Sequence, residues 1–142
     1  MSYDTWCEFF KERYRKLYGY MRERGVIVIH HADCYCANIA KDLAEIGVQI
    51  WQGAVPANDI PAVQKELDGS MIIMGGINAE IDRKDWTEEE VRRETRRACE
   101  EYAPGGAFIP CLTYGGPNSI FPGVDTAMRD EIAKYNKEHY NI

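Results

Sequence analysis

The stretch Val26-Ile27-Val28-Ile29-His30-His31-Ala32-Asp33-Cys34-Tyr35-Cys36 contains the pattern that fixes the fold class. It opens with four β-branched residues and no polar alternation, which is typical of a parallel strand buried on both faces. Imidazole, carboxylate and thiol groups follow directly. The stretch therefore predicts a buried strand that delivers reactive side chains at its carboxyl end.

Three more short apolar runs follow, and each one comes after a helical pattern. We expect strands at 26–29, 48–51, 71–74 and 107–110, and helices at 4–24, 38–46, 60–67, 87–102 and 124–140. Asp4 or Thr5 can cap the first helix, and Thr87 to Glu90 form a capping-box start. Strands that alternate with helices indicate a single α/β domain with a parallel sheet over residues 1–142.

Composition limits the partners that the chain can have. The formal net charge of −6 disfavours binding to nucleic acid, whose phosphates attract basic proteins. No apolar run approaches the roughly 20 residues of a membrane span, and charged residues interrupt the N-terminal segment, so we expect a cytoplasmic protein. The five cysteines are odd in number and irregularly spaced, which argues against a disulfide framework.

Reactive residues follow the predicted strands directly. The carboxyl ends of parallel strands meet at one edge of the sheet, and such folds bind their ligands there. Imidazole, thiolate and carboxylate are the usual ligands of zinc. The candidate ligands are His31, Asp33, Cys34, Cys36 and Cys111. Because neither His-x-Asp nor Cys-x-Cys is a zinc-finger spacing, buried core cysteines are the alternative.

Other residues at the same edge could contact a substrate. The side chains that can position one through hydrogen bonds are Gln52, Asn78 and Tyr114. The pair Gly75-Gly76 permits either a tight turn or a close approach of the backbone to a ligand. Adjacent strand residues point to opposite faces, so only one of His30 and His31 can face the site. We expect His31 to do so, with His30 toward the helices.

The order and spacing of several motifs resemble a known superfamily. The motifs are His31-x-Asp33, Asp42 to Val48, Met74-Gly75-Gly76-Ile77-Asn78 and Ala103 to Ile109. Over essentially its whole length, the chain resembles the C-terminal half of uroporphyrinogen decarboxylase-like proteins. These include the decarboxylase of haem synthesis and zinc-dependent methyltransferases that work with corrinoid proteins. The resemblance implies the C-terminal half of a (β/α)₈ TIM-type barrel, with four parallel strands alternating with helices.

The resemblance also implies roles for individual residues. In the methyltransferase branch, a His-x-Cys motif and a distant cysteine bind zinc. His31 matches the histidine, Cys111 lies near the distant cysteine, and Asp33 stands in place of the middle cysteine, with Cys34 as its neighbouring substitute. Tyr114 falls where the decarboxylase branch carries a histidine, and it is the candidate catalytic residue. From their place at the strand ends, the expected substrate-binding residues are Gln52, Gly75, Gly76 and Asn78.

The implied function is zinc-dependent methyl transfer between a corrinoid protein and a thiol-type acceptor. One alternative is porphyrinogen decarboxylation in haem synthesis, and another is a non-catalytic half-barrel remnant or binding module. Half a barrel leaves two unpaired edges and an uncovered inner face. We therefore expect one of three situations: the chain is a fragment of a longer protein, it pairs with a separate N-terminal half, or it self-associates to complete the barrel.

Overall fold

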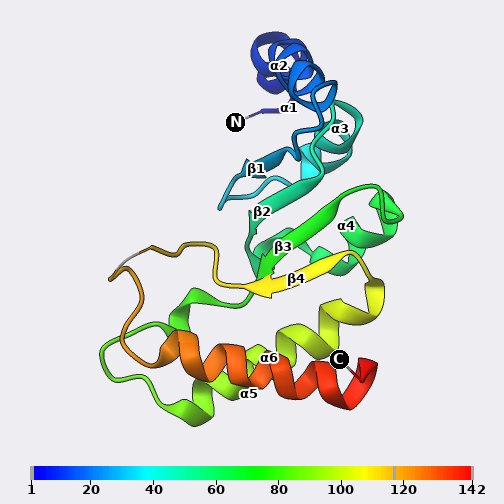
Figure 1. The fold of residues 1–142 in the computed structure, drawn as a ribbon. Helices are drawn as coiled ribbons and strands as arrows, with labels where there is room; N and C mark the ends of the chain where they lie inside the picture. Colours follow the sequence, from blue (N-terminus) through cyan, green and yellow to red (C-terminus); the bar gives the residue numbers. More distant parts are fainter. Residues whose placement is uncertain (1, 117, 142) are drawn as a thin grey trace.

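A four-stranded, all-parallel sheet forms the centre of the molecule in the computed structural model, which describes residues 2–116 and 118–141 (Figure 1). The strands are β1 (Ile29–His31), β2 (Ile50–Ala54), β3 (Ile72–Gly76) and β4 (Phe108–Cys111). They lie in the order β1-β2-β3-β4, the same as their order along the chain. The predicted α/β class with a parallel sheet is confirmed.

Helices connect the strands and precede the first one. The α-helices are α1 (Tyr3–Trp6), α2 (Glu12–Arg22), α3 (Ala40–Glu45), α4 (Ile60–Leu67), α5 (Glu88–Tyr102) and α6 (Val124–Tyr140). A π-helical segment, η1 (Cys7–Lys11), joins α1 to α2. The short 3₁₀ segments are η2 (Ala37–Ile39), η3 (Pro56–Asn58), η4 (Ala79–Ile81) and η5 (Ala103–Gly105).

The caps explain where two helices begin. The backbone N–H of Glu90 donates to the hydroxyl of Thr87 at 3.3 Å, as the predicted capping box requires. At the other end of the chain, the N–H of Thr5 donates to the hydroxyl of Ser2 at 3.2 Å. Ser2 is therefore the cap of the first helix, and the prediction of Asp4 or Thr5 was wrong by a few residues.

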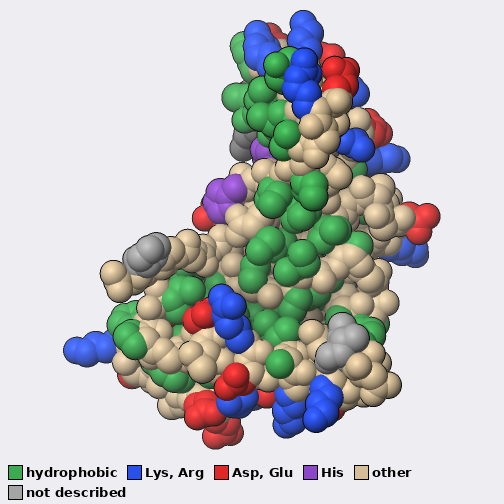
Figure 2. All heavy atoms as spheres, in the orientation of Figure 1, with side chains coloured by type: hydrophobic (Ala, Val, Ile, Leu, Met, Phe, Trp, Pro, Cys, Tyr) green, Lys and Arg blue, Asp and Glu red, His purple; other side chains and the backbone are tan. Residues whose placement is uncertain are grey.

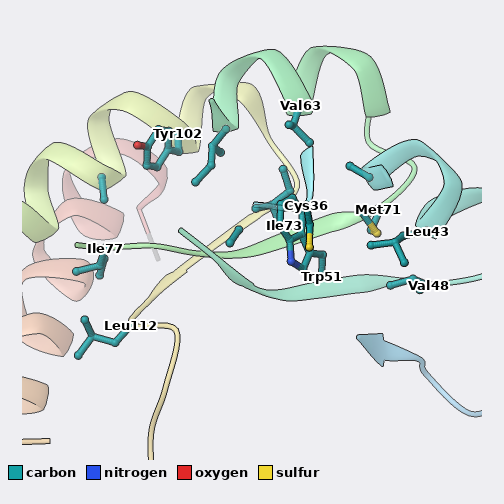
Figure 3. Packing of buried hydrophobic residues seen from close by; sticks show 14 of the residues in the cluster. Cys36, Leu43, Val48, Trp51, Val63, Met71, Ile73, Ile77, Tyr102 and Leu112 are labelled. Carbon is teal, nitrogen blue, oxygen red and sulfur yellow. The ribbon is translucent and has the colours of Figure 1, made fainter. Parts of the chain in front are cut away.

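The helices cover only one face of the sheet. His30, Trp51, Ile73 and Phe108 are in register across the four strands, and both Trp51 and Ile73 are completely buried. Figure 3 shows Trp51 and Ile73 among the core residues between the sheet and the helices. The opposite face carries a parallel row that consists of His31, Gln52, Met74 and Ile109.

This open face corrects the first strand prediction. The strand spans Ile29–His31 rather than 26–29, and it is not buried on both faces, because Ile29 is 56% exposed and Ile27 is 63% exposed. Figure 2 shows hydrophobic side chains gathered over the strands on the side that faces the viewer in Figure 1. The β-branched run has the composition of a strand that is buried on both faces, but the described helices cover only one of its faces.

Two polar contacts hold the outer helices. The indole of the buried Trp6 donates to the Asp42 carboxylate at 3.0 Å, and Lys11 donates to its other oxygen at 2.6 Å. Burial alone would raise the pKa of Asp42, but these two donors outweigh it and keep the pKa below its usual range. On the opposite side of the molecule, Arg96 of α5 pairs with the buried Glu131 of α6 at 2.7 Å.

Among the described residues, no helix has both the length and the apolar composition that a membrane span requires.

Candidate functional site

An open hollow of about 1110 Å³ lies at the carboxyl ends of β1, β2 and β4. Its wall continues along the segment between β4 and α6 and along one side of α6 itself. Of the residues that the sequence singled out, His31, Asp33, Gln52, Cys111 and Tyr114 line this hollow. Parallel strands therefore bring together groups that are up to 83 positions apart in the chain.

A chain of hydrogen bonds fixes the orientation of His31. Gln52 Nε2 donates to the backbone carbonyl of Thr113 at 3.0 Å. A carbonyl can only accept, so the amide oxygen of Gln52 must point the other way, toward His31 Nδ1, with which it forms a hydrogen bond. The amide oxygen is also only an acceptor, so Nδ1 carries the hydrogen. In the neutral ring, Nε2 then has a free lone pair.

The lone pair of His31 lies at the polar rim of the hollow. Nε2 is 3.9 Å from the Asp33 carboxylate, and both side chains are more than half exposed. At that distance and exposure the pair contributes little to stability. Nε2 therefore remains available to accept a proton from a molecule in the hollow or to bind an electrophile.

His30 points to the opposite face, as predicted. Its Nδ1 lies 2.8 Å from the hydroxyl of Tyr18, and its ring packs edge-on against Tyr14 and Tyr18 of α2. Burial, followed by the neighbouring His31, lowers the pKa of His30. The two adjacent imidazoles thus have different environments, one in the helical layer and one in the hollow.

The predicted zinc ligands are not assembled within this chain. No three His, Cys, Asp or Glu residues in the described ranges lie close enough together to hold a metal ion. His31 and Cys111 are on the two edge strands, which a spacing of roughly 4.8 Å between neighbouring strands separates by about 14 Å. Zinc bonds its ligands at roughly 2.0–2.3 Å. Burial also raises the pKa of Cys111 to about 11, so this thiol stays protonated at neutral pH.

Cys34, the proposed substitute ligand, does not line the hollow. Its sulfur lies 3.5 Å from that of Cys36. Cys36 is almost completely buried, so the expectation of a core cysteine fits it better than that of a ligand.

Tyr114 lies in the hollow, but its hydroxyl is already bonded. It donates to the Asp82 carboxylate at 2.8 Å, and the other oxygen of Asp82 accepts the N–H of Phe121 at 2.8 Å. Burial, followed by the bond to Asp82, raises the pKa of Tyr114 to about 12. The geometry of Tyr114 suits a residue that positions the segment between β4 and α6. Asp82 was not anticipated, because an acidic residue in a loop ordinarily faces solvent.

Gly75, Gly76 and Asn78 lie away from the hollow and have structural contacts. A Cβ on Gly75 would come within 2.8 Å of the Ala54 backbone nitrogen, and one on Gly76 would come within 2.8 Å of the Phe108 ring. Asn78 accepts the N–H of Glu80 at 3.1 Å and caps η4. The two expectations for the glycine pair were a tight turn and a close approach to a ligand. The positive φ of both glycines at the end of β3 fits the turn, and close packing around them is an additional finding.

Asn58 is a site residue that sequence reasoning missed. It is completely buried, and its amide oxygen accepts the N–H groups of Cys36 and Ala37 at 2.8 and 3.0 Å. Its amide nitrogen donates to the carbonyls of Cys34 and Val55 at 3.0 and 3.1 Å. One side chain thus fixes the segment that follows β1. Nothing in the sequence distinguishes this asparagine from one in a solvent-exposed turn.

Gly53 also shapes the rim of the hollow. It lies at a bulge where the pairing of β2 with β3 shifts, and its φ is +106°. A Cβ there would come within 2.8 Å of the Ala32 carbonyl oxygen. A glycine therefore lets the chain that leaves β1 pass close over β2, which places His31 beside Gln52.

No protein-family model matches this sequence, and no curated protein matches it.

Proposed function

We propose that this chain is half of a barrel enzyme of the uroporphyrinogen decarboxylase-like kind, closest to its methyltransferase branch. The hollow at the strand ends would bind a small protic molecule of the thiol type, and His31 Nε2 would accept its proton. The hydrogen-bonded series Thr113–Gln52–His31 is the observation that carries this proposal. It presents an unprotonated ring nitrogen at the position where parallel α/β folds bind their substrates.

In this proposal, the residues of the chain prepare the acceptor for methyl transfer. Gln52 holds the imidazole ring and keeps its hydrogen on Nδ1. Removal of the acceptor proton by Nε2 leaves a thiolate, which is the nucleophilic form of a thiol. As the ring becomes positively charged, the Asp33 carboxylate 3.9 Å away attracts it weakly, because both side chains are exposed.

Zinc has no part in this step, because the described side chains do not assemble a site for it. Zinc binding and the corrinoid partner stay predictions from the resemblance, and they require ligands from outside this chain. Among the described lining residues, the charged groups are Asp33, Asp125 and Arg129. Arg129, the one Lys or Arg among them, is already paired with Asp125 at 2.7 Å. This charge pattern disfavours a porphyrinogen, whose carboxylates need basic partners.

The exposed surface supports the idea that another polypeptide completes the barrel. The chain exposes 8459 Å², whereas a compact monomer of 16.3 kDa would expose roughly 7500 Å². The excess, on the order of 1000 Å², is close to the roughly 800 Å² that one partner contributes to a standard interface. The open face and the free edges of β1 and β4 supply this area.

The helices favour a separate half over a second copy of this chain. A barrel has one helix for each strand. This chain already has α2 beside β1 and α6 after β4, so a helix lies next to each free edge of the sheet (Figure 1). A second copy would bring two helices to each junction. We therefore propose a complement that begins and ends with a strand.

The tautomer of His31 tests the proposed proton acceptor directly. We expect nitrogen NMR spectra of the neutral ring to show the hydrogen on Nδ1, because Gln52 offers only an acceptor there. Replacing Gln52→Leu should shift the ring toward the other tautomer, whereas His30 should keep its own spectrum. Addition of 2-mercaptoethanol should perturb His31 Nε2 more than His30.

If the neutral His31 ring of the native chain carries its hydrogen on Nε2, the assignment of Nε2 as the proton acceptor is wrong. Gln52→Glu is a matched variant, since it keeps an acceptor for Nδ1 but cannot donate to Thr113. It should retain the tautomer while loosening the segment after β4. If both Gln52 variants behave like the native chain, Gln52 does not orient the ring.

Substitutions on the two faces of the sheet test whether the apolar face is open. We expect Ile29→Lys to change the free energy of unfolding by no more than about 0.5 kcal/mol, because this side chain is already 56% exposed. The same change at Ile73, which is completely buried, should prevent folding. Chemical denaturation and light scattering would measure both. A large loss of stability for Ile29→Lys, together with dissociation of a native dimer, would favour self-association instead.

A further inference from the structure

The two thiols that follow β1 lie within reach of one another. Cys34 Sγ and Cys36 Sγ are 3.5 Å apart, which is about 1.5 Å longer than a disulfide bond. No other pair of sulfur atoms in the described ranges is in such contact, and all five cysteines are free.

Asn58 holds the backbone on both sides of this pair. Its amide nitrogen donates to the Cys34 carbonyl, and its amide oxygen accepts the Cys36 N–H at 2.8 Å. Because Asn58 is itself completely buried, the two cysteines are fixed to a rigid part of the core. Such anchoring raises the effective concentration of one thiol at the other.

The two thiols differ in access to solvent. Cys34 is exposed, whereas Cys36 is only 6% exposed and is part of the core shown in Figure 3. Burial, followed by the hydrogen bond between Cys36 and Cys34, raises the pKa of Cys36 to about 12. A reagent from solvent therefore reaches Cys34 first. Cys36 reacts only after the reagent has become attached to Cys34. This is the arrangement of an attacking thiol and a resolving thiol.

We propose that Cys34 and Cys36 form a reversible intramolecular disulfide at the edge of the hollow, by exchange with a low-molecular-weight disulfide. The Cys34 thiolate attacks oxidised glutathione, which gives a mixed disulfide on Cys34 and releases one glutathione thiolate. Cys36 then loses its proton, its thiolate attacks Cys34 Sγ, and the second glutathione leaves as a thiolate that takes up this proton. The two cysteines lose two electrons and two protons in total, and one oxidised glutathione becomes two reduced molecules.

This reaction would change the rim of the hollow. Cys34 directly follows Asp33, which faces His31, so closing the bond draws this part of the rim toward the core. It also removes the exposed thiol that the native chain offers to electrophiles. The inference depends on the geometry of Cys34 and Cys36, and it is independent of the proposed proton-acceptor role of His31.

Mass spectrometry of the full chain after incubation with oxidised glutathione tests the inference. Blocking free thiols and cleaving after Tyr35 should give two peptides joined through Cys34 and Cys36, since the cleavage separates the two cysteines. Dithiothreitol should release them. The joined species should form in preference to any bond that involves Cys7, Cys99 or Cys111.

Two serine variants separate the roles of the thiols. Cys36→Ser should accumulate glutathione on Cys34, because the resolving thiol is missing. Cys34→Ser should take up no glutathione at Cys36, and Cys111→Ser should behave like the native chain. A native chain that retains glutathione on Cys34 while Cys36 stays open to alkylation would overturn the proposal, as would a chain with no reaction at Cys34.

Discussion

Replacing Asn58→Ala is expected to lower the free energy of unfolding by about 3 kcal/mol. The side chain is completely buried and makes four hydrogen bonds to the backbone, two as acceptor and two as donor. Alanine leaves the N–H groups of Cys36 and Ala37 and the carbonyls of Cys34 and Val55 without these partners. Urea denaturation followed by circular dichroism measures the loss. The segment after β1 should also exchange its amide hydrogens faster.

The variant Asn58→Asp is the matched control, because it has nearly the same shape. A carboxylate can accept from Cys36 and Ala37 but cannot donate to Cys34 and Val55. It should therefore destabilise the chain at neutral pH. The deficit should shrink as the pH falls, since protonation removes the buried charge and restores a donor. Wild-type stability in both variants would show that Asn58 does not support the site.

The fold was predictable where local chemistry agrees with tertiary packing. The bounds of α4 and α6 match the predicted ranges, and α5 begins one residue after its predicted cap, Thr87. Gly, Pro and capping residues mark these ends, and they act through backbone geometry that the sequence itself specifies. The first strand was displaced because apolar composition indicates burial without showing which layer supplies it. The helices of this chain cover one face only, and this is a tertiary property.

The hollow was predictable for a different reason. Any residue that directly follows a parallel strand reaches the same edge of the sheet, so His31, Gln52 and Cys111 could be placed there from the sequence. The distances between these residues could not be predicted from the sequence. The order of the strands decides these distances, and it separates β1 from β4 by two strands. The same topology that gathers the residues around a hollow therefore keeps His31 and Cys111 from sharing an ion.

The residues that support the site were not predictable. Asn58 and Asp82 are polar residues in loops, and their composition is typical of solvated turns. Their roles come from backbone groups that approach them from elsewhere in the chain, Cys34 and Cys36 in one case and Phe121 in the other. A buried polar side chain is stable only with such partners, and a single sequence does not reveal them.

Gly75→Ala is expected to lower the free energy of unfolding by about 3–5 kcal/mol. The φ of Gly75 is +151°, and a Cβ there would press against the backbone of Ala54 on the neighbouring strand. Backbone cannot move aside as a flexible side chain can. Thermal and chemical denaturation of the chain without any ligand would measure the effect.

Gly69→Ala is the control that separates packing from ligand contact. Gly69 also has a positive φ, +75°, but a Cβ there meets no atom within 4 Å. This variant should cost only the roughly 1–2 kcal/mol of a left-handed conformation. If Gly75 served only to let a ligand approach, its alanine variant would cost no more than Gly69→Ala in the free chain. A clearly larger loss at Gly75 means that this glycine is needed for the close packing of β3 against β2. In that case its role is to support the sheet that carries the hollow.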